Sequence, residues 1–132
     1  AVLDDGNVAC WGQNIRGQLG IGNTSDKYIA DAIDVDLGTG RTAKDIGVGS
    51  ESVCALLDND LVKCWGQGGG GRLGYEDKTS RGDGAGEMGD SLLPVNLAST
   101  HYAIELHCGQ KHMCIAEACP IPMVRCSSAA SP

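Results

Sequence analysis

The sequence contains no phenylalanine, and aromatic residues make up only 4% of its 132 residues. It also lacks any run of about 18 apolar residues, the length that a membrane-spanning helix needs. These absences exclude a core built on large aromatic side chains and, within these residues, a membrane helix. The chain is instead rich in glycine, with 20 residues, which is typical of a domain with many tight turns.

Positive charge is also scarce. Ten Lys and Arg face 17 Asp and Glu, so the net charge is −7 and the pI is about 4.7. Nucleic acids and anionic membranes both bind basic patches, so neither is expected as a partner. The chain does not open with the positively charged and then apolar segment of a secretory signal peptide. Its start at "AVLDDG", which reads as the middle of a strand, predicts a segment of a longer series of repeats.

Cysteine is abundant, with seven residues. That number exceeds ordinary cytosolic usage and favours an oxidising compartment, although a reduced metal-binding protein stays open as an alternative.

The chain repeats itself. "AVLDDGNVACWGQNIRGQLG" (1–20) aligns with "ALLDNDLVKCWGQGGGGRLG" (55–74) at an offset of 54 residues. "DVDL" (34–37) aligns with "PVNL" (94–97) at an offset of 60, because six residues are inserted after Gly74 in "YEDKTSRGDGAGEMGD". The sequence therefore predicts a little over two copies of one unit.

Each unit is expected to form strands. "VCALL" and "LVKCW" are short, aliphatic and separated by Asp58–Asp60, which predicts a hairpin with a three-residue loop. The third loop residue should be left-handed, a conformation that suits Gly6 in the first copy and is less comfortable for Asp60 in the second. No window has a sustained helical period, so the fold class is all-β.

The Trp-Gly and Gly-Gln-Leu-Gly pattern resembles the repeats of the regulator of chromosome condensation family. Residues 2–22 and 47–74 match it, and "GQKHMCI" (109–115) begins a third copy. The resemblance implies part of a β-propeller with four-stranded antiparallel blades, in units of about 1–54, 55–114 and 115–126, followed by a tail at 127–132. A closed seven-bladed ring would need about 400 residues, so further blades of the same parent chain are expected. The repeat signature comprises Trp11, Gly12, Gly17, Leu19, Gly20, Gly49, Trp65, Gly66, Leu73, Gly74, Gly109 and His112.

The hairpin register predicts the disulfides. Cys54 falls opposite Cys64 across the Asp58–Asp60 loop, at a distance that a disulfide accepts. The third copy then pairs Cys114 with Cys126, and Cys108 with Cys119 is a further candidate. The same symmetry places the partner of Cys10 directly before Ala1, so Cys10 is expected to be unpaired by truncation.

Zinc is the alternative use of the C-terminal cysteines. His107, Cys108, His112, Cys114 and Cys119 crowd one segment, but the spacing of a zinc knuckle is missing. The resemblance implies that His112 is a buried structural histidine. A redox role would need a Cys-x-x-Cys motif or an activated thiolate, and neither is visible.

The acidic insert at 75–90 offers two further candidates. Its carboxylates could hold Ca²⁺ on a flexible loop, but their spacing fits no EF-hand, so a solvated loop is expected. Arg81-Gly82-Asp83 matches an integrin-recognition tripeptide that recurs by chance. "GQGGGG" (66–71) lacks the Lys-Ser/Thr of a phosphate loop, and no nucleophile elbow is present. We therefore expect no catalytic, cofactor or metal site.

The function predicted is a non-catalytic, rigid protein-binding scaffold, extracellular or at the cell surface. The partner is a protein, and loops 22–34 and 75–93 are expected to contact it. A guanine-nucleotide exchange factor for a small GTPase, in the cytoplasm or nucleus, is the alternative that the founding family member suggests. An inhibitor of a secreted enzyme is a second alternative.

Overall fold

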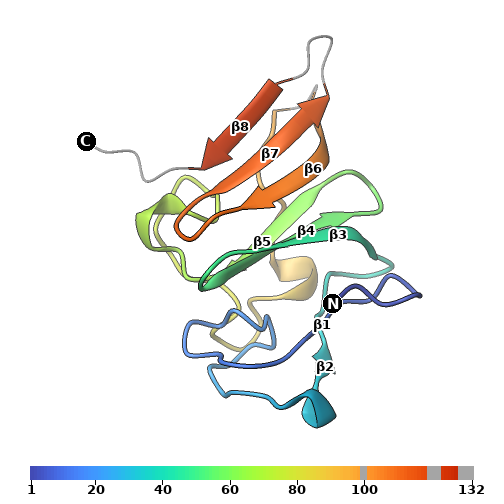
Figure 1. Cartoon of the computed structure of the whole chain (residues 1–132), viewed down its shortest axis with the longest axis vertical. Helices are drawn as coiled ribbons and strands as arrows, with labels where there is room; N and C mark the ends of the chain where they lie inside the picture. Colours follow the sequence, from blue (N-terminus) through green and yellow to red (C-terminus); the bar gives the residue numbers. More distant parts are fainter. Residues whose placement is uncertain (99–100, 119–122, 128–132) are drawn as a thin grey trace.

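The structure is a computed structural model that describes residues 1–98, 101–118 and 123–127. Its strands form three antiparallel sheets that follow one another along the chain. Figure 1 shows them one above another, with the two-stranded sheet of β1 and β2 below and the C-terminal sheet at the top. The all-β prediction is confirmed: the described helical segments are single 3-10 turns, η1 (Ile29–Asp31), η2 (Gly69–Gly71) and η3 (Gly89–Ser91).

The middle sheet is the centre of the molecule. It contains β3 (Ala43–Val48), β4 (Ser52–Leu57) and β5 (Val62–Gly66) in that order. The N-terminal unit has a two-stranded sheet, β1 (Ala9–Cys10) with β2 (Ile33–Asp34), and the C-terminal sheet has β6 (Tyr102–Cys108), β7 (Met113–Ala118) and β8 (Met123–Ser127). The predicted boundaries of the repeat units stay a prediction.

Two hydrophobic cores flank the middle sheet. One contains Leu56, Val62 and the two cysteines of its hairpin, packed against Leu106 and other residues of the C-terminal sheet. The other contains Val53, Leu57 and Trp65, packed against Val8 and other residues of the N-terminal unit. Because neighbouring residues of a strand point to opposite faces, all six residues of β4 are buried.

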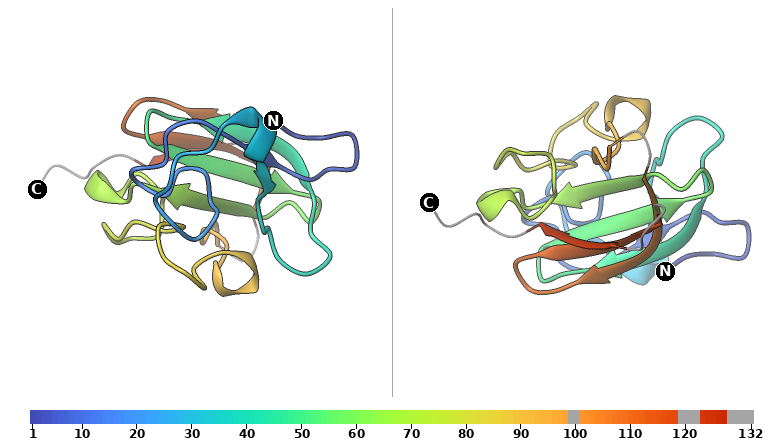
Figure 2. Two further views of the ribbon diagram at one scale, coloured as in Figure 1. Left: turned by 90° about the horizontal axis from the view of Figure 1, so that it is seen from below. Right: turned by 90° about the horizontal axis from the view of Figure 1, so that it is seen from above.

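The middle and C-terminal sheets repeat one another in detail. The register between β3 and β4 shifts at Ala43/Asp45, and the register between β6 and β7 shifts at Ala103/Glu105, sixty residues later. Both shifts coincide with two consecutive exposed residues, which a β-bulge accommodates by placing two residues opposite one. The sheets are therefore consecutive blades of one repeating architecture, seen along two other directions in Figure 2.

Each complete blade was predicted to have four strands. In the middle blade the fourth position is taken by residues 94–97, whose contact with β5 includes one backbone hydrogen bond, from Val95 N–H to Val62 O at 2.7 Å. Val95 and Leu97 are buried there. The segment lies beside β5 without forming a regular ladder with it.

Candidate interaction surface

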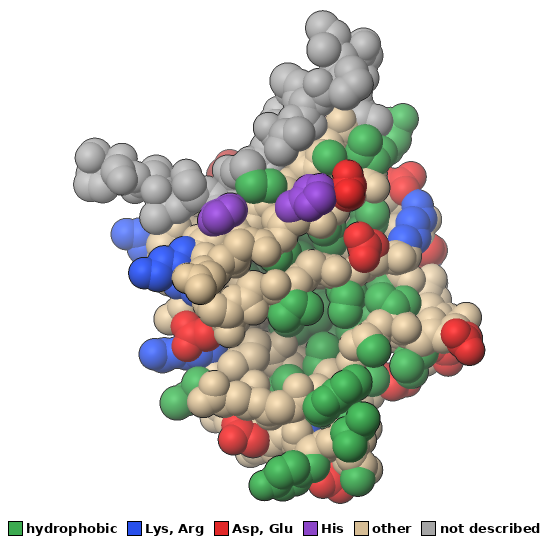
Figure 3. Space-filling model, in the orientation of Figure 1, with side chains coloured by type: hydrophobic (Ala, Val, Ile, Leu, Met, Phe, Trp, Pro, Cys, Tyr) green, Lys and Arg blue, Asp and Glu red, His purple; other side chains and the backbone are tan. Residues whose placement is uncertain are grey.

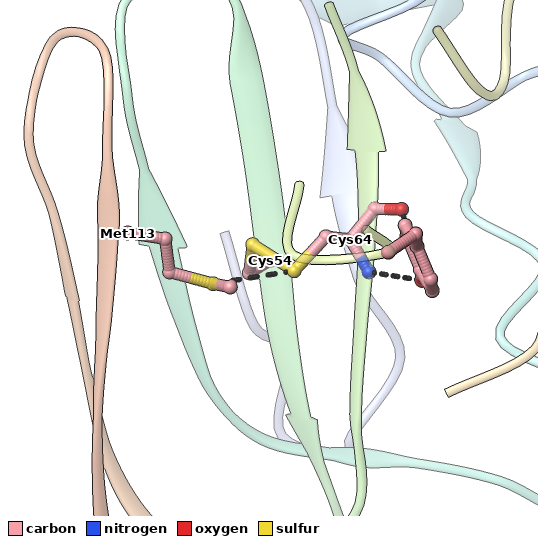
Figure 4. The surroundings of a disulfide bond; sticks show 4 residues. Cys54, Cys64 and Met113 are labelled. Atoms are coloured by element: carbon pink, nitrogen blue, oxygen red, sulfur yellow. Dashed lines mark hydrogen bonds between the residues drawn. A yellow bond between two sulfur atoms is a disulfide. The ribbon is translucent and has the colours of Figure 1, made fainter. Parts of the chain in front are cut away.

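The middle hairpin is stapled as the sequence predicts. Cys54 and Cys64 form a disulfide with their Cα atoms 4.1 Å apart, and both side chains are buried. Asp60 adopts the left-handed conformation expected of the third loop residue, with φ of 65°. Met113, from the C-terminal sheet, points at the disulfide in Figure 4, with its Sδ 3.2 Å from Cys64 Sγ.

The cysteines of the C-terminal sheet follow the prediction in part. The β7–β8 register places Cys126 opposite Cys114, and Cys114 takes part in a disulfide. Its pairing with Cys126 stays a prediction, because the Cys126 side chain lies outside the described ones.

The predicted Cys108–Cys119 bridge is wrong, because Cys108 is a free thiol. Its side chain lies in the junction between sheets, against Gly47 of β3. Burial, helped by the charge of Asp45, raises the pKa of Cys108 to about 11, so the thiol is protonated and unreactive near neutral pH. Cys119 itself lies outside the described residues.

Cys10 is also a free, half-buried thiol, and burial raises its pKa. Its pairing with a residue before Ala1 stays a prediction. The zinc and Ca²⁺ alternatives gain no support: among the described residues, no group of three or more His, Cys, Asp or Glu could hold a metal ion.

The repeat signature builds the junction between units. Trp65 is fully buried, and its indole N–H donates to the carbonyl of Gln18 in the N-terminal unit at 3.1 Å. Gly20 has φ of +66°, and a Cβ there would lie 2.6 Å from the indole nitrogen. Only glycine therefore fits at Gly20, because a side chain would be strained and would strike the ring. Leu19 and Leu73 are buried beside these loops.

Four more signature glycines have the positive φ that favours glycine: Gly12, Gly17, Gly66 and Gly74. The other two signature glycines close equivalent turns. Gly49 N–H donates to Ser52 O at 2.8 Å, and Gly109 N–H donates to His112 O at 2.9 Å.

The expected burial of His112 is wrong, because its side chain is exposed. It lies on the face of the C-terminal sheet opposite to buried Met113, and the middle sheet packs only against the Met113 face. Ser52, sixty residues earlier, is buried because both faces of its sheet are covered.

Sequence reasoning missed Tyr75, the first residue of the insert. Its hydroxyl accepts a hydrogen bond from Cys64 N–H at 3.0 Å and donates to Cys64 O at 3.3 Å. In the first unit the matched residue, Cys10, pairs with the main chain of Ile33 instead. Burial raises the pKa of Tyr75 to about 12, so the hydroxyl stays protonated and able to donate. The signal was a tyrosine where the first copy has Ile21.

The Arg-Gly-Asp tripeptide is engaged within the chain. Arg81 forms an ion pair with Asp77 at 2.8 Å and lies over the ring of Tyr75. Hydrogen bonds from Arg81 and Thr79 lower the pKa of Asp77 to about 2. Glu87 accepts hydrogen bonds from the N–H groups of Gly82 and Gly84, both at 2.9 Å. The Arg81 side chain is therefore engaged by Asp77 and Tyr75 of the same insert.

The exposed surface over the predicted contact loops is acidic and partly apolar. Residues 23–26 and 28–31 are exposed, including Asp26 and Asp31, and Tyr28 has 82% of its surface accessible. In Figure 3 the hydrophobic side chains gather low on the molecule, over the region where Figure 1 places β1 and β2. A hollow of about 510 Å³ lies between the insert and residues 91–96, with Leu93 and Glu76 among its lining residues.

The described part of the chain contains no helix long and apolar enough to cross a membrane.

Comparison with known proteins gives several relatives. The chain is 32% identical over 114 residues to the ultraviolet-B receptor UVR8 of Arabidopsis thaliana, covering 85% of this chain and 23% of the receptor. It is 34% identical over 77 residues to the mouse X-linked retinitis pigmentosa GTPase regulator, covering 58% of this chain and 8% of that protein. No family model matches the chain.

Solved structures support the same architecture. The crystal structure of human WBSCR16 superposes with a TM-score of 0.69 at 14% identity, covering 87% of this chain and 27% of that one. Yeast RCC1 (Prp20) in its complex with Kap60 superposes with a TM-score of 0.64 at 17% identity, covering 88% of this chain and 27% of that one. At these identities the likeness concerns the fold alone, and the chain spans about a quarter of the length of these structures.

Proposed function

The chain belongs to the regulator of chromosome condensation (RCC1)-like repeat family, and on that premise we propose that it is a non-catalytic, rigid scaffold for binding another protein. The observation that carries the proposal is the contrast between a fixed frame and exposed loops. The frame consists of a disulfide-stapled hairpin and two inter-sheet cores. Loops on such a frame are held in one arrangement and lose little conformational freedom when a partner binds.

The proposed contact region is loop 22–34 together with the outer tip of the insert, 76–79. Both are acidic: the first holds three Asp and one Lys, and the second holds one Glu, one Asp and one Lys. A partner with a basic, partly apolar patch would complement them. The Cys54–Cys64 disulfide supports an extracellular or cell-surface location, because such bonds persist in oxidising compartments.

A regulator of a small GTPase is the second candidate. It is favoured by the name of the mouse relative and by a solved yeast Prp20p structure, TM-score 0.59, whose title names binding to Gsp1p and histones. The inhibitor hypothesis stays a prediction.

The test reverses single charges in the full chain and measures capture of a partner. Each variant carries a benzophenone amino acid in place of Tyr28 and is photo-cross-linked in extracellular fluid of the source organism. Asp31→Lys and Glu76→Lys should each weaken capture of one defined partner several-fold, more at low than at high salt. Asp4→Lys, an equal charge change outside both loops, is the control. Equal capture by all variants would overturn the proposed contact region.

Two further measurements separate the candidate functions. Thiol counting on the chain unfolded without reductant should leave Cys54, Cys64, Cys114 and Cys126 unreactive, and a chain that folds with all seven cysteines reduced would overturn the extracellular location. Acceleration of nucleotide release from a small GTPase by the chain would favour the regulator instead.

A further inference from the structure

The insert after Gly74 divides into two halves that differ in exposure. All four residues of the outer tip, 76–79, are exposed, whereas the inner half, 81–92, contains three buried residues, Gly82, Gly89 and Leu92. In Figures 1 and 2 the inner half lies beside the N-terminal loops, far from it in sequence. The inner half therefore has a packing role that the tip does not share.

The first contact of the inner half is with the signature loop of the N-terminal unit. Gly22 N–H donates to Gly82 O at 3.2 Å. Gly17 is so close to the insert that a Cβ on it would lie 2.7 Å from the carbonyl carbon of Gly82. This approach of two backbones is possible only because both residues are glycine.

The second contact is at η3. Gly89 N–H donates to Asp36 O at 2.9 Å. The carboxylate of Asp90 accepts two hydrogen bonds from Thr39, from its N–H at 2.9 Å and its hydroxyl at 2.6 Å. Asp36 and Thr39 both follow β2, so η3 is fixed to the N-terminal unit and not to its own blade alone.

The third contact is a buried lysine of the middle sheet, Lys63. Its ammonium group donates to Leu37 O at 2.9 Å and to Gly89 O at 2.8 Å. Lys63 is only 7% exposed, and desolvation lowers its pKa against the opposing effect of Asp90 and Asp36. A buried cation is tolerated only with such partners, and here they come from the N-terminal unit and the insert.

We propose that residues 81–92 are a strap that locks the N-terminal unit onto the middle blade, with Lys63 as the residue that joins the three segments. The N-terminal unit needs such a lock, because its sheet has only the two-residue strands β1 and β2. The division also sharpens the scaffold proposal without resting on it: the tip is free for a partner, and the strap is not.

Limited trypsin digestion of the full chain tests the strap directly, since the insert offers two trypsin sites three residues apart. Cleavage after Lys78, in the tip, should be about tenfold or more faster than cleavage after Arg81, because local opening governs proteolysis. Equal rates at the two bonds would overturn the proposal, and both sites are present in the unmodified protein.

Hydrogen exchange on variants tests the role of Lys63. In the native chain the amides of Gly22, Thr39 and Gly89 should exchange about tenfold or more slowly than those of the tip. Lys63→Met should accelerate all three together, and Lys44→Met, which removes an exposed lysine of the same sheet, should not. If Lys63→Met does not fold, Asp90→Ala provides the measurement, because its side chain is exposed. Loss of protection at Thr39 alone, or in none of the three, would overturn the proposal.

Discussion

The two tryptophans of the repeat occupy matched positions and have opposite environments. Trp65 is completely buried between the middle sheet and the N-terminal unit, whereas Trp11 has 44% of its surface exposed. Both follow a cysteine and precede a glycine with positive φ. The local sequence therefore sets the same backbone twice, and the presence of a neighbouring unit decides whether the ring is buried.

The 3-10 turns η1 and η3 repeat this contrast. They are sixty residues apart and begin after Tyr28 and Met88, respectively. Met88 and Leu92 pack into the core shared with the N-terminal unit, but at the matched positions Tyr28 is exposed and Ala32 is only half-buried. The second unit uses this turn to hold the first, whereas among the described residues Tyr28 and Ile29 of the matching turn in the first unit are largely exposed.

Substituting each tryptophan in turn tests whether the neighbouring unit accounts for their difference. Trp65→Ala should lower the free energy of unfolding by about 3–5 kcal/mol, because it empties a filled core site and leaves Gln18 O without its donor. Trp11→Ala should cost about 1 kcal/mol or less. Urea unfolding of both variants measures the difference, and similar costs would contradict the view that the neighbour supplies the burial.

The junction glycine provides the next test. Gly20→Ala should cost about 2–4 kcal/mol, since it combines a left-handed backbone with a collision against the Trp65 ring. Gly40→Ala is the control: its φ is +67°, but nothing lies within 4 Å of an added Cβ. That variant should cost only the backbone strain, about 1 kcal/mol. Equal losses in urea unfolding would show that contact with Trp65 contributes nothing.

The N-terminal hairpin offers a position for a disulfide like that of the middle hairpin. Ala9 N–H donates to Ala1 O at 3.0 Å, and Val2 pairs with Val8, so a residue directly before Ala1 faces Cys10. A cysteine placed there should form a disulfide with Cys10 and stabilise the protein by about 2–3 kcal/mol. Mass spectrometry under non-reducing conditions checks the bond. The same addition in a Cys10→Ser variant is the control and should give no stabilisation.

The smallest expected effect concerns the tip of the insert, which the first unit lacks. The pKa of Asp77 is lowered from 3.8 to about 2, so its ion pair with Arg81 stabilises the fold above about pH 4. That contribution is lost as the pH falls towards 2. Since the side chain is 43% exposed, the effect should be under about 1 kcal/mol. Asp77→Asn should flatten acid unfolding in that range, and an unchanged pH dependence would contradict the assignment.

The repeat, the hairpin register and the first disulfide were predictable because each depends on spacing along one short segment. The antiparallel register follows from the loop, and Cys54 opposite Cys64 follows from the register. The exposure of His112 and the free thiol of Cys108 were not predictable, since both depend on which face of a sheet has a neighbour. The roles of Lys63 and Tyr75 were not predicted for a related reason. Their partners lie on other segments of the chain, and a lone lysine or tyrosine in a sequence does not indicate a structural site.

Tyr75 has a consequence for how such repeats can change in length. A single phenol satisfies both backbone groups of Cys64, which in the first unit are satisfied by a strand. One side chain can thus satisfy the backbone groups at the outer edge of a blade while the main chain leaves that edge to form a loop. Loop growth at this point leaves no open edge for other chains to join, so the position directly after Tyr75 is a natural place to graft a foreign peptide.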